Sequence, residues 1–213
     1  MLRWRDRRHA AEALADELPH LSGSRALILA IPRGGIEVGG AVARRLEGDL
    51  DVIIARKLGA PWNPELAIGA VTGDGVPVLD HELISRLRVS EGQVEAEIAR
   101  QAEEVRRREE AYRRGRPPRQ PAGRTVVVVD DGVATGATAR AALRYVRRRD
   151  PRHLVFAVPV GPPDTITALA KEADEVVCPL QPPRFLAVGE WYDEFSQVSD
   201  QEVMEMLGEV GEV

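Results

Sequence analysis

A chain of 213 residues, 44% of them hydrophobic, is long enough for one α/β domain with a sizeable core. Its formal net charge of −5 leaves no overall basic footprint, so we expect no nucleic-acid partner. A single cysteine excludes an internal disulfide framework, and a charged start with no long apolar run indicates a soluble, cytoplasmic protein with no membrane partner.

Helix-like and strand-like segments alternate in the first quarter of the chain. Residues 3–18 carry apolar side chains at helical spacing, and residues 35–46 (GIEVGGAVARRL) predict a second helix. Two short apolar runs, residues 26–31 and 50–55, predict buried strands on either side of that second helix. This order is typical of a strand–helix–strand unit.

The next part of the chain departs from this alternation. Residues 58–66 (LGAPWNPEL) contain two prolines and a glycine, which predicts a loop that is neither strand nor helix. Two apolar stretches, AIGAV and VPVL, lie on either side of residues 73–75 (GDG), which predicts a hairpin. Residues 81–114 mix Glu and Arg with apolar side chains at helical spacing, so we expect one long exposed helix or two shorter ones. We interpret residues 81–120 as an insertion that serves as a lid, a homodimer contact or a spacer.

The second half of the chain returns to strands and helices. After a proline-rich loop, the predicted elements are strands at residues 125–130, 153–160 and 175–180 and helices at residues 136–149 and 164–173. Strands that alternate with helices predict an α/β fold, a parallel sheet flanked by helices, in a single domain spanning residues 1–213. Cys178 lies in the last predicted strand, and we expect a buried, inert thiol there.

Polar and glycine-rich groups follow three of the predicted strands. Two aspartates, Asp130 and Asp131, follow one strand. Residues 32–35 (PRGG) follow another, and the basic pair Arg56 and Lys57 follows a third. Because parallel sheets bind ligands at the carboxyl ends of their strands, we expect these groups to converge on one site.

The loop after the two aspartates is suited to an anion. Residues 132–138 read GVATGAT, and small side chains let backbone amides turn toward a phosphate at the start of the next helix. The hydroxyls of Thr135 and Thr138 add donors. The loop is neither a Walker A loop nor a dinucleotide fingerprint. An ordinary strand-to-helix turn is the alternative, but it does not explain two adjacent carboxylates, which repel each other.

The stretch VVVVDDGVATGAT, residues 126–138, resembles the phosphoribosyl diphosphate-binding motif of type I phosphoribosyltransferases. IPRGG resembles the pyrophosphate loop of that family, and ARKLGAP resembles the start of its mobile active-site loop. The resemblance, over roughly residues 27–180, implies transfer of ribose 5-phosphate from phosphoribosyl diphosphate to a nitrogen of a base-like acceptor, with loss of pyrophosphate and help from Mg²⁺. For the fold we expect the strand order 3-2-1-4-5, with a hood from about residues 1–21 and 181–213.

The resemblance also implies roles for single residues. Asp130 and Asp131 would bind the ribose hydroxyls, favour the sugar cation and hold the metal mainly through the substrate, and with Arg33 and Lys57 they form the implied catalytic set. The further substrate-binding residues are Gly34, Gly35, Arg56, Val133, Ala134, Thr135, Gly136, Ala137 and Thr138. The family often has a non-proline cis peptide in the pyrophosphate loop, which we expect at Arg33–Gly34. A solvent-facing carboxylate has little packing role, so we expect Asp131→Asn to leave the fold intact.

The acceptor is the least defined part of the predicted site. Family members that act on 6-oxopurines usually carry an acid where this chain has Ala134, so the likeness is to the adenine and xanthine types. Glu65 is a candidate for acceptor protonation, in a segment that is either a closing lid or a surface connection. The hood aromatics either stack on a flat acceptor or hold the hood on the core; they are Phe185, Trp191, Tyr192 and Phe195.

Two other functions stay open from the sequence. A non-catalytic regulator could keep the site and bind phosphoribosyl diphosphate or a nucleotide. The arginine-rich helix predicted over residues 81–114 favours a regulatory function, whereas the interleaved glutamates argue against an RNA-binding face. A diphosphokinase that makes the sugar diphosphate would need a second nucleotide motif, and none is visible.

Overall fold

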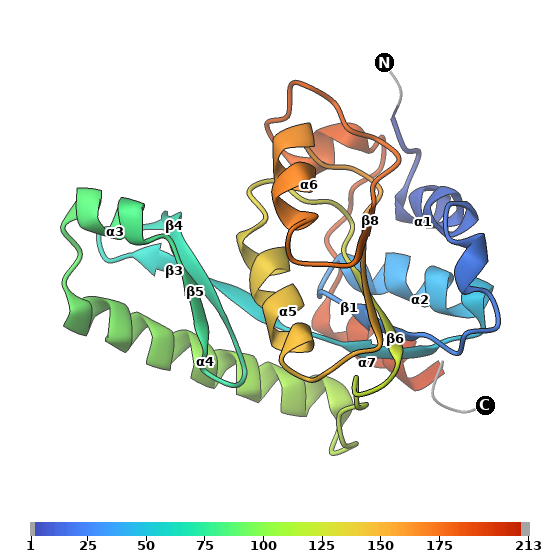
Figure 1. Ribbon diagram of the computed structural model, residues 1–213, viewed down its shortest axis with the longest axis horizontal. Coiled ribbons are helices and arrows are strands. Elements are labelled where there is room, and N and C mark those ends of the chain that lie inside the picture. The colour runs from blue at the N-terminus through green and yellow to red at the C-terminus, as the bar shows by residue number, and fades with distance from the viewer. Residues whose placement is uncertain (1–2, 210–213) are drawn as a thin grey trace.

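A sheet of five parallel strands lies at the centre of the structure, a computed structural model that describes residues 3–209 (Figure 1). The strands are β1 (Leu27–Ala30), β2 (Asp49–Val52), β6 (Thr125–Val129), β7 (His153–Ala157) and β8 (Glu175–Val177). Leu27 pairs with Asp49 on one side of β1 and with Val126 on the other. The predicted fold class, a parallel sheet flanked by helices, is confirmed.

The order of these strands is β2-β1-β6-β7-β8, which differs from the expected 3-2-1-4-5. The first predicted strand is inside, as expected, but it lies between the second and the third. Composition explains this arrangement. Strand β2 carries Asp49 and Asp51, which pair with Arg119 from the loop that covers this edge, whereas β6 is entirely apolar and fully buried after its first residue. A strand with two carboxylates suits the edge, and a run of valines suits the interior.

Helices cover both faces of the sheet. On one face lie α1 (Arg7–Asp16), α2 (Gly35–Leu46) and α7 (Asp200–Glu209), and on the other lie α5 (Ala137–Arg147) and α6 (Pro163–Leu169). Successive strand residues point to opposite faces, so Ile28 and Val127 pack with the first group while Leu27 and Val126 pack with the second. The carboxyl ends of the strands therefore belong to a sheet that has a hydrophobic core on each of its two faces.

Residues 55–113 form an arm that projects to the left in Figure 1. It contains an antiparallel sheet of β3 (Ala55–Ala60), β4 (Asn63–Thr72) and β5 (Pro77–Leu79), followed by α3 (His81–Leu87) and α4 (Glu91–Arg113). A small core of its own, which includes Leu58, Ile68 and Val94, holds the strands to α4. The predicted hairpin around residues 73–75 is confirmed, and residues 81–114 form two helices.

The prediction of a loop at residues 58–66 is wrong, because these residues belong to the hairpin of β3 and β4. Its turn consists of Pro61 and Trp62, between the paired residues Ala60 and Asn63. A Cβ at Gly59 would lie 2.7 Å from the backbone of Pro64, so glycine lets the two strands approach. The register shifts around Gly59, which accommodates the proline.

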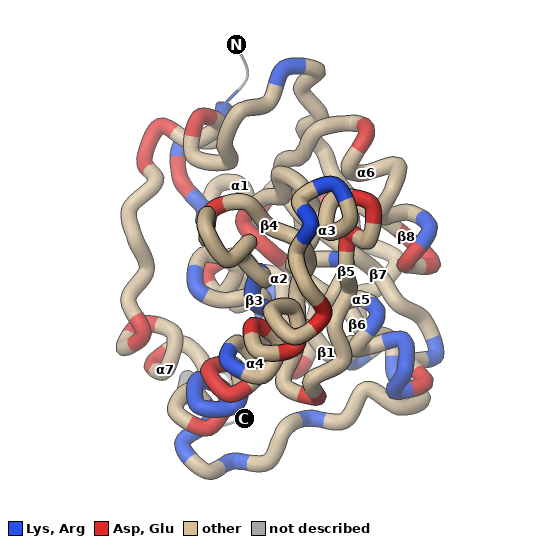
Figure 2. The backbone as a smooth tube through the Cα atoms, turned by 90° about the vertical axis from the view of Figure 1, so that its left-hand side faces the viewer, with Lys and Arg blue, Asp and Glu red and all other residues tan. Residues whose placement is uncertain are grey.

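Helix α4 is stabilised by a cap and by its own surface charges. The hydroxyl of Ser90 accepts from the Gln93 amide while the Gln93 side chain accepts from the Ser90 amide, which is a capping box. Acidic and basic residues alternate along the helix (Figure 2), and Arg107 and Arg108 both bond Glu104. No helix within residues 3–209 is long and apolar enough to cross a lipid bilayer.

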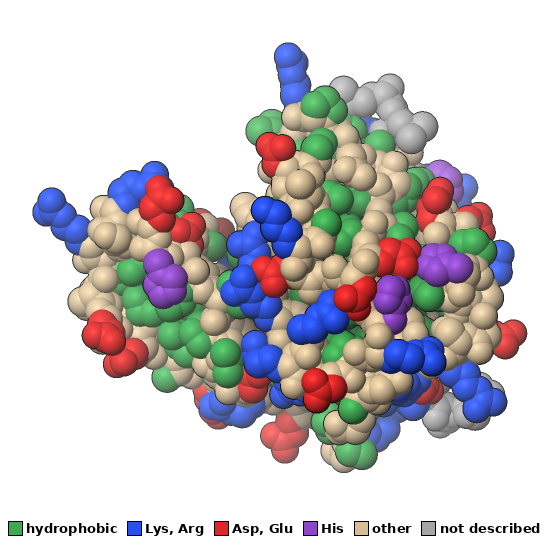
Figure 3. All heavy atoms as spheres, in the orientation of Figure 1, with side chains coloured by type: hydrophobic (Ala, Val, Ile, Leu, Met, Phe, Trp, Pro, Cys, Tyr) green, Lys and Arg blue, Asp and Glu red, His purple; other side chains and the backbone are tan. Residues whose placement is uncertain are grey.

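Ion pairs attach the arm to the rest of the molecule at two points. Arg113, the last residue of α4, donates to the Asp51 carboxylate at 3.0 Å and to the Val52 carbonyl at 2.8 Å. Asp74, in the turn before β5, accepts from Arg148 just after α5 at 2.8 Å. Between these attachments and the free end of the arm, the surface is hollowed (Figure 3).

Segments from both ends of the described chain meet in a hood, which we define as residues 3–21 and 181–199. The Trp4 amide donates to the Trp191 carbonyl at 2.9 Å, and Trp4 forms a parallel bridge with Tyr192. Two short 3-10 helices, η1 (Pro19–Leu21) and η2 (Val188–Trp191), belong to the hood. Helix α7, which we had expected in the hood, packs against α2 and α4 instead. Residues 1–2 and 210–213 lie outside the described part.

Candidate functional site

Asp130 and Asp131 stand directly after β6, at the carboxyl end of a central strand. The Asp131 amide donates to Oδ1 of Asp130 at 2.8 Å, which fixes the first carboxylate beside the backbone. Burial and the negative charge of Asp131 raise the pKa of Asp130 well above its usual value. The two carboxyl groups therefore form a closely coupled acidic pair at the edge of a rigid sheet.

Arg7 of α1 contacts the acidic pair, and sequence reasoning missed it. Its Nε donates to Oδ2 of Asp131 at 2.7 Å, its Nη1 donates to the Ser196 carbonyl at 2.7 Å, and its side chain is only 6% exposed. A signal was present, because Arg7 lies on the buried stripe of α1 with Ala10, Ala11, Leu14 and Ala15. A charged residue in an apolar stripe indicates a buried partner.

Tyr192 holds the same aspartate from the hood. Its hydroxyl donates to the main-chain carbonyl of Asp131, and burial raises the pKa of Tyr192, so the hydroxyl stays a neutral donor. Trp191 and Tyr192 are buried, which fits the role of holding the hood on the core. Phe185 stacks on Trp191 with 6.2 Å between ring centroids, and Phe195 is 38% exposed.

The glycine-rich loop after β1 packs directly against the acidic pair. A Cβ at Gly34 would lie 1.8 Å from Oδ2 of Asp131, and a Cβ at Gly35 would lie 3.0 Å from the Val129 carbonyl. Only residues without a side chain allow this close approach. The cis peptide is at Pro32–Arg33, one bond before the position that we expected.

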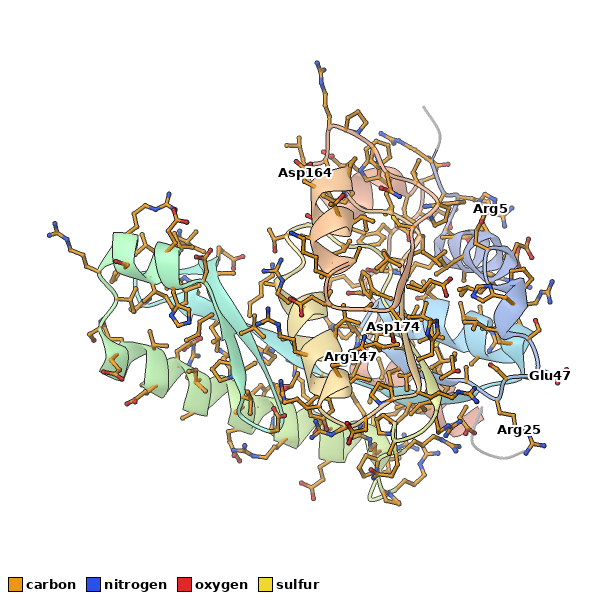
Figure 4. All side chains as sticks on the ribbon, viewed as in Figure 1. Arg5, Arg25, Glu47, Arg147, Asp164 and Asp174 are labelled. Carbon is orange, nitrogen blue, oxygen red and sulfur yellow. The ribbon has the colours of Figure 1, made fainter. Side chains whose placement is uncertain are left out.

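The loop after the acidic pair leads into α5 through Gly136, whose φ of +76° favours glycine. Helix α5 has no side-chain cap, which leaves its first amides free to bind an anion. Its other end is anchored, since Arg147 bonds the Asp174 carboxylate at 2.8 Å and the two side chains face each other in Figure 4. The side chain of Val133 is buried in the core, so only its backbone can face a ligand.

Two cavities lie between this loop and the arm. One, of about 450 Å³, is lined by Thr138 and Pro32, and the other, of about 580 Å³, is lined by Thr135 and Ala137. Lys57 and Glu65 line both, so the cavities meet at these two side chains.

Three cations of the predicted site lack acidic partners. In the described part of the chain, Arg33, Arg56 and Lys57 form no ion pair with a carboxylate. Burial lowers the pKa of Arg56, and the positive charge of Arg108 lowers it further. Cations to which no carboxylate is bonded favour an anionic ligand, although Glu65 and Glu97 also line the cavity of about 450 Å³.

Two further expectations concern metal binding and the thiol. Within residues 3–209, no group of three or more His, Cys, Asp or Glu side chains is arranged to hold a metal ion. Cys178 is buried directly after β8, and burial raises the pKa of its thiol to about 12. The expectation of a buried, inert thiol is consistent with this placement.

Comparison with known proteins agrees with this geometry. The family model described as phosphoribosyl transferase domain matches residues 5–193. The chain belongs to the phosphoribosyl transferase domain family. A Mycobacterium tuberculosis H37Rv protein, provisionally named a phosphoribosyl transferase, is 45% identical over 202 residues, which are 95% of this chain and 46% of the relative. This phosphoribosyl transferase domain therefore spans about half the length of the curated relatives that it matches.

Solved structures of similar proteins extend the comparison. The crystal structure of TT1426 from Thermus thermophilus is 46% identical, with a TM-score of 0.83, and the likeness covers 98% of this chain and 99% of that one. A purine phosphoribosyltransferase from Pyrococcus horikoshii is 17% identical with a TM-score of 0.49, over 89% of this chain and 90% of that one.

Proposed function

We propose that this protein is a phosphoribosyltransferase that moves ribose 5-phosphate from phosphoribosyl diphosphate to a ring nitrogen of a base-like acceptor and releases pyrophosphate. One observation carries the proposal. The acidic pair, the uncapped start of α5 and the cations Arg33, Arg56 and Lys57 lie at one edge of the sheet. These groups are complementary to the ribose, the 5-phosphate and the diphosphate of one small molecule.

Substrate binding follows from the charges of the three groups. The amides of residues 135–138 and the positive end of α5 would hold the 5-phosphate, with the Thr138 hydroxyl as a further donor. The diphosphate would lie in the cavity beside Lys57 and Arg56, whose charges neutralise the leaving group. The ribose hydroxyls would then donate to Asp130 and Asp131.

The chemical step needs a fixed negative charge beside the sugar. As the bond from the anomeric carbon to the diphosphate oxygen breaks, positive charge develops on the ribose, and the acceptor nitrogen donates its lone pair to form the new bond. Asp131 is held by Arg7 and Tyr192, so its charge acts without reorganisation of the site. A proton leaves the acceptor nitrogen, and Glu65, which lines both cavities, stays a candidate for proton transfer to or from the acceptor.

The acidic pair also fits a magnesium ion that is held mainly through the substrate. Mg²⁺ prefers oxygen ligands, and its sites in phosphate-binding enzymes commonly use one or two carboxylates with substrate oxygens and water. Asp130 and Asp131 supply carboxylate oxygens of this kind, although Oδ2 of Asp131 already accepts from Arg7. When bound, the ion would neutralise charge on the diphosphate and ease its departure.

The acceptor would lie on the hood side of the acidic pair. Phe195 offers an exposed ring beside Arg7, whose guanidinium carbon lies 4.0 Å from the ring centroid. The exposed part of the ring, rather than the face that Arg7 covers, would contact a flat acceptor. Ala134 precedes Thr135 where 6-oxopurine enzymes of this family usually carry an acid, which favours acceptors of the adenine or xanthine type.

A pyrophosphate-release screen tests the proposal. Purified protein would be given phosphoribosyl diphosphate, Mg²⁺ and single purines, pyrimidines or other ring acceptors, while calorimetry measures binding of phosphoribosyl diphosphate alone. Release with one acceptor supports the transferase. Binding without release for any acceptor indicates the regulatory alternative, and absence of binding to both phosphoribosyl diphosphate and ribose 5-phosphate refutes a phosphoribosyl site.

A further inference from the structure

Helix α4 of the arm forms one wall of the cavity beside Thr138. The cavity of about 450 Å³ is bounded on one side by Pro32 and Thr138 of the central domain and on another by β3. The α4 residues that line it are Glu97, Arg100, Gln101, Arg108 and Tyr112. The segment that the sequence predicts as an insertion, serving as a lid, a homodimer contact or a spacer, therefore lines a cavity of the candidate site.

We propose that α4 supplies part of the binding site for the pyrophosphate group, with Arg108 as a pyrophosphate-binding residue. This inference rests on the proposed function, since it concerns the leaving group of the same reaction. It assigns the arm a role in substrate binding, which distinguishes it from a spacer or a contact between protein copies.

The arrangement of charge around Arg56 supports this assignment. Burial lowers the pKa of Arg56, and the charges of Arg108 and Arg100 lower it further while those of Glu104 and Glu97 raise it, so Arg108 lies close enough to repel Arg56. Arg100 is paired with Glu97 at 2.6 Å, whereas Arg56 has no carboxylate partner among the described residues. A dianion or trianion between Arg56 and Arg108 would turn this repulsion into attraction.

Side-chain hydrogen bonds hold these cations in place. Nε of Arg56 donates to the buried Gln101, and the Gln101 amide in turn donates to Glu97 at 2.9 Å. Tyr112 is buried and donates to Asp200 of α7 at 2.6 Å. The wall is therefore anchored to α7 as well as to β3, which is what preorganised recognition of a small anion requires.

The neighbouring Arg107 provides a matched control. Arg107 and Arg108 both bond Glu104, at 2.8 and 2.7 Å, and both lie on the same helix. Only Arg108 lines the cavity, and its side chain is 30% exposed compared with 62% for Arg107. Removing either charge changes the net charge of α4 equally, so a difference between the variants reports on the cavity.

Calorimetry of Arg108→Gln and Arg107→Gln with two probes tests the inference. The probes are inorganic pyrophosphate with Mg²⁺ and ribose 5-phosphate, which lacks the diphosphate. We expect Arg108→Gln to weaken pyrophosphate binding about tenfold and to leave ribose 5-phosphate binding unchanged, because one charge-assisted contact is lost. Arg107→Gln should match the wild-type protein for both probes, and Arg108→Lys should recover part of the affinity.

The outcomes separate this inference from the proposed function. If wild-type protein binds ribose 5-phosphate and pyrophosphate but Arg108→Gln binds both equally well, the role of α4 is overturned and the proposed function stands. Equal weakening by Arg107→Gln also overturns it, because a general effect of charge then explains the loss. If wild-type protein binds neither probe, the proposed function itself fails. Circular dichroism and a urea unfolding curve for each variant establish that the fold is retained.

Discussion

Asp131 takes part in the packing of the protein through the carboxyl group that would face the ribose. Its Oδ2 accepts from the buried Arg7, and only 13% of its side chain is exposed. The premise that this carboxylate faces solvent and has little packing role is therefore wrong, because it neutralises a buried guanidinium, whereas survival of the fold in Asp131→Asn stays a prediction. Removing one partner of such a pair leaves the other charge without compensation.

We predict that Asp131→Asn lowers both stability and turnover. The loss of charge opposite Arg7 should reduce the free energy of unfolding by about 1–3 kcal/mol. Turnover should fall by a larger factor than the Michaelis constant for phosphoribosyl diphosphate rises, since the charge acts mainly in the transition state. Urea unfolding and steady-state pyrophosphate release measure the two effects.

A second variant separates these two roles of Asp131. Arg7→Gln should lower stability by a similar amount, and the double variant should be less destabilised than the sum of the two single variants, because the same contact is lost in each. Strict additivity of the two changes in unfolding free energy would show that the contact between Arg7 and Asp131 contributes nothing.

At the scale of single elements, α4 depends on its first turn. The helix spans 23 residues with few buried positions, and it begins with the Ser90–Gln93 capping box. Its mid-helix ion pairs are largely exposed, and such pairs contribute little to stability. The cap therefore has a large share in determining where the helix begins.

We predict that Ser90→Ala destabilises the arm more than the central sheet. Loss of the cap costs about 1 kcal/mol, since the helix loses a partner for its amides. Hydrogen exchange should become faster in residues 91–98 while the amides of β1 and β6 keep their rates. Ser90→Thr retains the hydroxyl and serves as the control. Uniform acceleration throughout the protein would show that the arm does not unfold on its own.

The sequence could predict most elements but not all of their types. Periodicity located the helices of the arm because their apolar and charged residues repeat at helical spacing. Residues 58–66 were misassigned because Pro61, Pro64 and Gly59 are loop formers when read locally. In the structure the two prolines lie in or beside a tight turn, and the glycine permits close approach of the strands. Pairing across the hairpin, which local composition does not report, decides the outcome.

At the scale of the whole molecule, the ion pair between Asp74 and Arg148 joins the arm to the central domain. The Asp74 carboxylate also accepts from the Thr72 hydroxyl at 2.7 Å. Although burial alone would raise the pKa of Asp74, the bonds from Arg148 and Thr72 outweigh it and lower the pKa. A carboxyl group with a lowered pKa in the folded state stabilises that state in its ionised form.

We predict that this attachment weakens as the solution becomes acidic. Its contribution to stability is complete above the ordinary aspartate pKa of about 3.9 and is lost as pH falls through the lower pKa of the folded state. Hydrogen exchange in β4 and β5, compared between wild type and Asp74→Asn, should differ at pH 6 and converge as the pH falls below 4. An equal difference in exchange rate at pH 6 and below pH 4 would show that the substitution acts through side-chain packing and not through the charge of Asp74.

The candidate site could be predicted from the sequence only where its residues are neighbours in the chain. Asp130, Asp131 and residues 135–138 form one continuous motif, so their placement together follows from the strand and helix on either side. Arg7 could not be identified in this way, because its partner lies 124 residues away. The strand order could not be predicted either, because several strands are equally apolar. Only β2 stands out, since its two aspartates suit a strand at the edge of the sheet.

The long separation of these partners has a consequence for how the protein is made. Arg7 is synthesised early, but its bonds to Asp131 and to the Ser196 carbonyl span 124 and 189 residues. During synthesis the central sheet can begin to form while this arginine is still without its partners, because domains fold as the chain emerges. The candidate site is therefore completed only after the segment around Ser196 has left the ribosome. A nascent chain that ends before this segment would carry the whole motif of residues 126–138 without a finished site.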